Sequence, residues 1–237
     1  MKTTYSILFI FLLLLASTGY SQTAKEYFNR GAAKSELKEF SGAITDYTRA
    51  IEIDHRYAKA YFWRGITQSK LKDFNEAIAD YTRAIEIEPN DEKAYFWRGS
   101  AKSELKEYSG ASADFTKAIE INQRYSEAYF WRGNAKNELK DYSGAIADCT
   151  KAIEIEPGFA KAYFWRGIAK NELKDHQGAI DDYTKAIEID PKEAKAYYYR
   201  GLLKIDLKEK ESACPDFRKA GELGIADAYE KIKKYCQ

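Results

Sequence analysis

The sequence predicts an all-α fold, a solenoid of six stacked helical hairpins closed by a C-terminal helix. The first observation behind this prediction is a period, because six glycines recur every 34 residues: Gly31, Gly65, Gly99, Gly133, Gly167 and Gly201. The second is that the five residues ending at each glycine return almost unchanged, as in Tyr61–Gly65 and Tyr129–Gly133. Periods of roughly 20 to 50 residues are typical of units that bury their apolar faces only against a neighbour.

Each repeat contains two stretches with helical periodicity. In the second repeat the first stretch, about Lys59–Leu71, brings four residues into one sector of a helix: Ala60, Tyr61, Thr67 and Leu71. The second stretch, about Asn75–Ile87, has one apolar stripe opposite its acidic residues, and Pro89 follows it. The repeating glycine lies inside the first stretch, where it costs about 1 kcal/mol relative to alanine. Its recurrence therefore indicates close helix packing.

The residues at fixed places in the repeat resemble the tetratricopeptide repeat (TPR) family. With the glycine as eighth residue, the second unit supplies the family pattern with Tyr61, Gly65, Ala77, Tyr81, Ala84 and Pro89. Departures are His55 and Gln123 in place of proline, Cys149 in place of an aromatic residue, and arginine at every seventh position. The resemblance implies a right-handed α-solenoid with units at residues 24–57, 58–91, 92–125, 126–159, 160–193 and 194–225, and a capping helix within 226–237.

The first 21 residues differ from the repeats. Lys2 precedes an uncharged apolar run over Ile7–Ala16, and Gly19-Tyr20-Ser21 has small residues suited to cleavage. This pattern predicts a secretory signal peptide at residues 1–21, with Gln22 as the first mature residue. An uncleaved membrane anchor is the alternative, but the run is shorter than the roughly 20 residues that span a bilayer. We expect an exported protein, periplasmic or secreted, similar to exported repeat proteins of Gram-negative envelopes, with no stable membrane insertion after cleavage.

The overall charge is balanced, with 38 Lys and Arg against 37 Asp and Glu. Nucleic acids and anionic membranes are bound by surfaces with a basic excess. The composition therefore argues against a nucleic-acid partner.

The three cysteines have different expected roles. Cys149 replaces a core aromatic residue, which predicts a small buried side chain. Cys214 lies in the second helix of the sixth unit and Cys236 in the last turn of the C-terminal helix. Because an exported protein meets an oxidising environment, we expect a Cys214–Cys236 disulfide that fixes the terminal helix. Pro215 suggests that the second helix of this unit starts late, since proline inside a helix is costly.

Arginine at the seventh and aspartate at the twenty-third position recur in all six units. The pattern predicts partly buried structural ion pairs, within a unit or between neighbours. The pairs of the four central units are formed from Arg64, Asp80, Arg98, Asp114, Arg132, Asp148, Arg166 and Asp182, and the outer units have Arg30, Asp46, Arg200 and Asp216.

In the TPR family the first helices line a concave groove, and the resemblance places an aromatic lining there. Tryptophan and tyrosine are common binding hot spots. The expected partner-binding residues are Phe62, Trp63, Phe96, Trp97, Phe130, Trp131, Asn134, Phe164, Trp165, Tyr198 and Tyr199. The phenylalanines border the core, so packing is an equal alternative for them. The tryptophans could instead fold into the seam between repeats.

Signatures of catalysis are absent from the sequence. The two histidines, His55 and His176, lie in different units, and no metal-ligand spacing, phosphate loop or nucleophile motif occurs. We therefore expect no enzyme activity, no catalytic residue, no metal and no cofactor.

The predicted function is that of an exported scaffold that binds a peptide or an extended segment of a protein partner in the groove. One alternative is a glycan-binding module that stacks sugars on the tryptophans, and another is a membrane-tethered envelope assembly factor. One subtype of TPR protein clamps chaperone tails with Lys and Asn at groove positions where this chain has aromatic residues. We therefore do not expect this chain to be a chaperone-tail adaptor.

Overall fold

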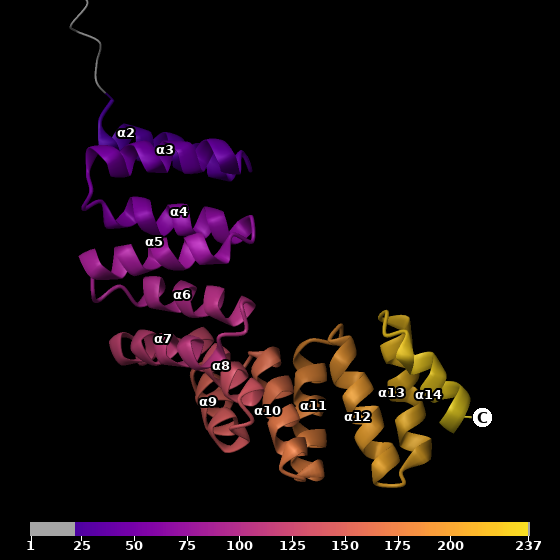
Figure 1. Ribbon diagram of the computed structural model, residues 1–237. Coiled ribbons are helices and arrows are strands. Elements are labelled where there is room, and N and C mark those ends of the chain that lie inside the picture. Colours follow the sequence, from indigo (N-terminus) through magenta and orange to yellow (C-terminus); the bar gives the residue numbers. More distant parts are fainter. Residues whose placement is uncertain (1–21, 237) are drawn as a thin grey trace, which may run out of the picture. The chain divides into compact units, whose positions relative to one another are not determined.

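The computed structural model describes residues 22–236, so the predicted signal peptide at residues 1–21 lies outside the described residues. Within residues 22–236 every regular element is an α-helix, and the helices of each repeat form an antiparallel hairpin (Figure 1). No described helix has the length and apolarity needed to cross a bilayer. The predicted all-α class is confirmed for this part of the chain.

Six helices, one per repeat, carry the repeating glycine. These first helices are α2 (Ala24–Glu36), α4 (Ala58–Lys70), α6 (Glu92–Glu104), α8 (Ser126–Glu138), α10 (Ala160–Glu172) and α12 (Ala194–Asp206). Each pairs with a second helix: α3 (Phe40–Ile53), α5 (Phe74–Ile87), α7 (Tyr108–Ile121), α9 (Tyr142–Ile155), α11 (His176–Ile189) and α13 (Lys210–Glu222). The last element, α14 (Asp227–Tyr235), packs on α13.

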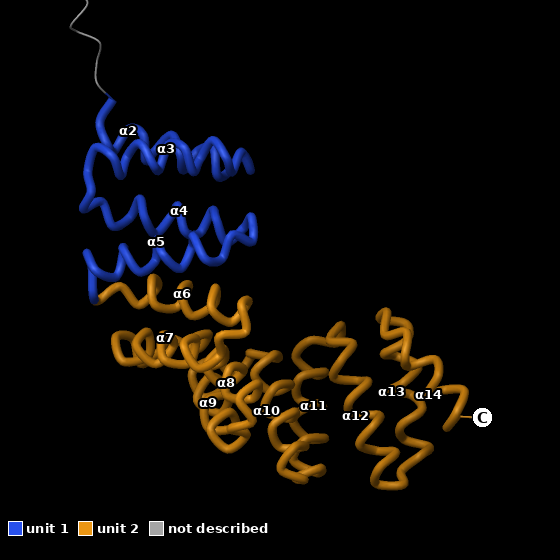
Figure 2. Tube along the Cα trace, in the orientation of Figure 1, with its two compact units in different colours: residues 1–89 blue, residues 90–237 orange. Residues whose placement is uncertain are grey.

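The chain divides into two compact units (Figure 2). Unit 1 ends at Pro89 and contains the hairpins α2–α3 and α4–α5. Unit 2 begins at Asn90 and contains the other four hairpins and α14. Each unit is described by itself below.

The glycines are explained by the residue that packs against each of them. A Cβ atom added to Gly167 would lie 2.7 Å from Cε1 of Tyr183, which is fully buried on α11. Protein interiors are packed too densely to absorb such an overlap. At Gly133 the partner is Cys149, whose Sγ lies 3.0 Å from the same position. Cys149 is a free, buried cysteine, as its place in the repeat predicts.

All six first helices end in the same turn. After α8, the Lys140 amide donates to the Asn137 carbonyl and the Asp141 amide to the Lys136 carbonyl, both at 2.9 Å. These two bonds define a Schellman motif, whose C′ residue adopts a left-handed conformation. Here that residue is lysine in every repeat, with φ between 62° and 66°: Lys38, Lys72, Lys106, Lys140, Lys174 and Lys208.

The turn also corrects one expectation. Leu71 was expected to pack beside Ala60 and Thr67, but it is an exposed residue that forms the C-cap of α4, whereas Ala60 and Thr67 are fully buried. At the C-cap the chain turns away from the helix axis, and the helical periodicity that supported the expectation no longer applies.

The prediction of a late start for the last second helix is wrong. α13 begins at Lys210, the same place in the repeat as its counterparts, and contains Pro215. Pro215 removes the hydrogen bond that would reach the Glu211 carbonyl. Both residues are exposed, so water can satisfy that carbonyl. The disulfide between Cys214 and Cys236 joins this region to the end of α14.

Candidate functional site

Each Arg–Asp pair forms within one hairpin. In the fourth repeat Arg132 donates from Nε to Asp148 Oδ2 at 2.9 Å and from Nη2 to Oδ1 at 2.6 Å. The same two-point contact joins Arg30, Arg64, Arg98, Arg166 and Arg200 to the aspartate 16 residues later. The structure therefore places both members of every sequence-predicted pair within the same repeat.

Three further contacts extend this pair. The remaining Arg132 nitrogen, Nη1, donates to Thr116 Oγ1 of the preceding hairpin at 3.1 Å, and Lys136 Nζ lies 2.8 Å from Asp148 Oδ2. The guanidinium carbon also lies 5.5 Å from the centre of the Tyr129 ring. These partners, which sequence reasoning missed, make the buried pair part of a polar network that joins two neighbouring hairpins.

The lysine that contacts the aspartate, Lys136 in the fourth repeat, has a counterpart in the first repeat of unit 1 but not in the second. Arg30, helped by Lys34, holds the pKa of the Asp46 carboxyl below its usual value. In the next repeat Gln68 occupies the lysine position, and burial raises the pKa of Asp80 despite its contact with Arg64. Gln68 Oε1 is buried without a hydrogen-bond partner among the described residues.

The four tryptophans are only partly withdrawn from solvent. Trp63 and Trp97 are 43% and 38% exposed, and Trp131 and Trp165 are half-buried. Trp131 packs against a core cluster that contains Phe96 and Ala128, both of unit 2. Trp131 and Trp165 thus contribute to the seam between repeats and keep part of the ring on the surface.

The phenylalanines before the tryptophans lie deeper. Phe96, Phe130 and Phe164 are buried, with Phe130 only 3% exposed, and Phe62 is half-buried. Each contacts its tryptophan with ring centres 5.2 to 5.9 Å apart. In the sixth repeat Tyr198 is half-buried and Tyr199 is exposed. The structure therefore favours packing as the main role of the three buried phenylalanines.

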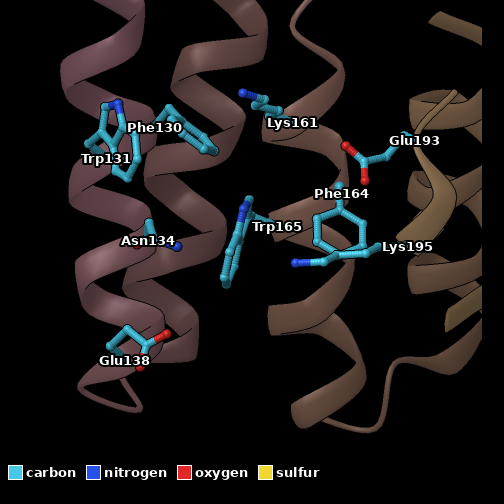
Figure 3. Close-up of a pocket in the computed structure, with 9 residues that line it drawn as sticks. All are labelled: Phe130, Trp131, Asn134, Glu138, Lys161, Phe164, Trp165, Glu193 and Lys195. Carbon is cyan, nitrogen blue, oxygen red and sulfur yellow. The ribbon is translucent and has the colours of Figure 1, made fainter. Parts of the chain in front are cut away.

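A pocket of about 430 Å³ lies between the first helices of unit 2 (Figure 3). Trp165 projects toward α8, near Asn134, while Phe130 and Phe164 contribute the little surface they expose. Lys161 lies at one end of the pocket and Glu138 at the other. The complete lining is Phe130, Trp131, Asn134, Glu138, Lys161, Phe164, Trp165, Glu193 and Lys195.

This pocket brings five of the predicted partner-binding residues together and adds charged ones. Glu193 was not anticipated, because it belongs to the turn before α12. Neighbouring Asn137 is buried, and its Nδ2 donates to the Trp165 carbonyl at 3.4 Å, which joins α8 to α10.

Unit 1 has a corresponding pocket of about 360 Å³ between α2 and α4. Its lining is Phe28, Ala32, Ser35, Glu36, Tyr47, Trp63 and Lys70. Tyr47 is fully buried, and burial raises the pKa of its phenol to about 12. Its hydroxyl has no hydrogen-bond partner among the described residues.

Residues 22–236 contain no group of three or more His, Cys, Asp or Glu side chains placed to hold a metal ion.

Solved structures share this architecture. A structure of MamA is 27% identical, with a TM-score of 0.68, and the match covers 73% of this chain and 94% of that one. YrrB, described as a TPR protein with an unusual peptide-binding site, is 22% identical with a TM-score of 0.66, covering 79% and 97%. A tetratricopeptide repeat protein from Parabacteroides merdae ATCC 43184 is 22% identical with a TM-score of 0.65, covering 92% and 86%. The similarities to YrrB and to the Parabacteroides merdae protein support the fold alone.

No curated protein matches the sequence. Family models described as Tetratricopeptide repeat match residues 58–91, 92–125, 126–159 and 160–193, and one described as TPR repeat matches residues 31–72. The matches extend over residues 31–193, more than half of the chain, and TPR proteins bind protein or peptide partners. The chain therefore belongs to the tetratricopeptide repeat family and is a protein–protein interaction scaffold.

Proposed function

We propose that this scaffold is exported and binds a peptide or an extended segment of a protein partner in the groove of unit 2. We define the groove as the surface of α6, α8, α10 and α12 that carries Trp97, Trp131, Asn134 and Trp165. The observation that carries the proposal is the pocket in which Trp131, Asn134 and Trp165 meet.

The chemistry of this surface suits a peptide. Partly exposed indole rings offer a large apolar contact with few rotatable bonds, which is typical of binding hot spots. The Asn134 side chain makes no hydrogen bond within the described residues, so its amide can both donate to and accept from a peptide backbone. The rings also pack against the core on their other side, which fixes their orientation before a ligand arrives.

Selection from a random peptide library, with the mature protein as target, tests the proposal. Peptides that bind the wild type should lose at least tenfold in affinity for Trp131→Ala/Trp165→Ala, about the effect of losing one hot spot. Tyr229→Ala is the matched control, since it removes an exposed aromatic side chain on α14, outside the groove. Peptides that bind the double variant as tightly as the wild type would contradict the proposal.

The glycan-binding alternative predicts a different response. Soluble polysaccharides would quench tryptophan fluorescence with little dependence on salt, whereas a charged peptide would bind more weakly as salt rises. Because Trp131→Ala/Trp165→Ala should weaken the binding of either ligand, the salt dependence distinguishes the two ligand classes.

Export is a separate part of the proposal. The Cys214–Cys236 disulfide supports it, because disulfides persist in oxidising compartments such as the periplasm or the extracellular space. The intact mass of the mature protein tests it. A chain that begins at Gln22 agrees with a cleaved signal peptide, and a full-length chain in the membrane fraction would favour the tethered alternative.

A further inference from the structure

The arginine of the first repeat completes its contacts differently from its counterparts. In later repeats Nη1 of this arginine donates to a threonine hydroxyl of the preceding hairpin, at 2.9 to 3.1 Å: Arg64 to Thr48, Arg132 to Thr116, Arg166 to Thr150 and Arg200 to Thr184. Arg30 lies on α2, the first of the described helices, and its Nη1 donates to Gln22 Oε1 at 3.0 Å. The Gln22 carboxamide therefore supplies the acceptor that threonine supplies in these later repeats.

Gln22 is also the proposed first residue of the exported chain. Once the bond to Ser21 is cut, its backbone nitrogen becomes a free amine on the same residue as the carboxamide that contacts Arg30. In an N-terminal glutamine this amine can attack Cδ, because the product is a five-membered lactam. The bond from Cδ to Nε2 then breaks, and Nε2 leaves as ammonia with one proton from the amine. The reaction therefore needs no oxidant, reductant or cofactor.

The contact with Arg30 favours this ring closure. As the amine attacks Cδ, negative charge develops on Oε1, and a charged N–H donor already held against that oxygen stabilises it. Arg30 is held in place by its two hydrogen bonds to the buried Asp46 carboxylate, from Nε and Nη2. Its third nitrogen, Nη1, is the one that contacts Gln22.

The charge of the new terminus also favours the lactam. Gln22 precedes Thr23, the N-cap of α2, so an ammonium group on Gln22 meets the positive end of the helix dipole. The Glu26 carboxylate of the first turn is engaged with the Thr23 amide at 2.7 Å. Because the lactam is neutral, its formation removes an unfavourable positive charge from the start of α2.

We propose that Gln22 of the exported chain cyclises to a pyroglutamyl residue and that Arg30 assists the reaction. The lactam keeps Oε1 as the acceptor for Arg30 and blocks aminopeptidases, which require a free α-amine. Removal of two residues would otherwise take away both this acceptor and the Thr23 hydroxyl that caps α2. The inference rests on the export part of the proposed function, because only cleavage after Ser21 makes Gln22 the first residue.

The intact mass of the protein isolated from its own host tests the modification. We expect a chain that begins at Gln22 and is lighter than its sequence requires by the mass of one ammonia molecule. A chain that begins at Gln22 with a free amine would overturn this inference and leave export intact. A chain that begins at another residue would overturn both the inference and the proposed cleavage site.

The rate of ring closure tests the role of Arg30 separately. Protein released from an N-terminal fusion so that Gln22 comes first should lose ammonia about tenfold faster than its Arg30→Met variant, the effect of one charge-assisted hydrogen bond. Arg200→Met is the matched control, since it removes the equivalent arginine of the sixth repeat and should leave the rate unchanged. Gln22→Leu has no carboxamide at this position and should keep its mass.

Circular dichroism shows whether Arg30→Met is folded. If this variant unfolds, a synthetic peptide of residues 22–31 replaces it in the comparison, because so short a chain does not hold the helix that brings Arg30 to Gln22. The peptide should lose ammonia about tenfold more slowly than the folded wild type. Equal rates for the wild type and the folded variant, or for the wild type and the peptide, would overturn the assistance by Arg30.

Discussion

Arg132 donates two hydrogen bonds to Asp148 within its own hairpin and a third to Thr116 of the preceding hairpin. The side chains of Arg132 and Asp148 are only 16% and 6% exposed. Removing Arg132 deprives the buried Asp148 carboxylate of two hydrogen bonds and leaves Lys136 as its only cation, whereas replacing both Arg132 and Asp148 with apolar residues removes that buried charge. We expect Arg132→Ala to lower the free energy of unfolding by about 3–5 kcal/mol, and Arg132→Met/Asp148→Leu to lower it much less.

Urea unfolding followed by circular dichroism measures both variants. Lys151→Ala is the control, because its exposed pair with Glu154 should contribute less than about 1 kcal/mol. A loss below about 1 kcal/mol for Arg132→Ala would show that the network is not needed for stability.

Gln68→Lys should stabilise unit 1 in a pH-dependent way. The raised pKa of Asp80 means that the folded state binds this proton more tightly than the unfolded state, so its ionisation weakens folding as pH rises past about 4. A lysine at position 68 would supply the cation found in the other five repeats and remove a buried carbonyl oxygen without a partner. We expect a gain of about 1 kcal/mol at pH 7 that is smaller at pH 3, because protonation of Asp80 removes the charge with which the lysine pairs. Urea unfolding at the two pH values measures it, and an equal gain at both would exclude this cause.

The same substitution at two equivalent glycines should have different costs. In Gly167→Ala the new methyl group overlaps Tyr183, whose ring is held beside Phe164 and Tyr199. Overpacking of about 1–3 kcal/mol then exceeds the roughly 1 kcal/mol gained in helix propensity. Gly133→Ala meets the smaller Cys149 side chain, and the two effects should nearly cancel. Melting temperatures compare the pair, and equal losses would refute the packing explanation.

Lys140→Gly is expected to stabilise the protein. A non-glycine residue in the left-handed region costs about 1–2 kcal/mol, and glycine removes that cost at the price of about 0.5–1 kcal/mol of backbone entropy. Since φ of Lys140 is 63°, the net gain should be about 0.5 kcal/mol. Lys136→Gly, within α8, should instead be destabilising. Thermal unfolding measures both, and a loss with Lys140→Gly would show that the lysine side chain contributes more than the strain costs.

The three cysteines should differ in reactivity. Burial raises the pKa of the Cys149 thiol to about 12, so iodoacetamide at pH 8 should label no cysteine of the native, oxidised protein. After reduction Cys214 and Cys236 should react, and Cys149 only in denaturant. Peptide mapping by mass spectrometry measures the labelling. Labelling of Cys214 without reductant would contradict the disulfide.

Cys236→Ser should also release α14. The bond closes a loop with a sequence separation of 22, for which loop entropy predicts about 3 kcal/mol. Amide hydrogen exchange should become faster in α13 and α14 of this variant. An unchanged exchange pattern would mean that packing alone holds the terminal helix.

The sequence by itself determined the repeating architecture, because each helix is encoded locally. Its apolar periodicity, its small residues and the turn that follows recur every 34 residues, and every first helix carries its glycine against the second helix. The Arg–Asp pairs were also predictable as pairs. The sequence could not show whether each arginine pairs with the aspartate of its own repeat or with that of a neighbouring repeat, because both arrangements satisfy the same helical spacing.

Only the tertiary structure decided which residues meet across repeats and how far each side chain is buried. Thr116 joins the Arg132 network from another hairpin, and Pro215 stays inside α13, where both it and Glu211, four residues earlier, are exposed residues. Phe130 and Trp131 are adjacent in sequence, yet the first is buried and the second is only half-buried. Successive residues of a helix point about 100° apart, and the packing of the neighbouring helices determines which of the two directions remains open.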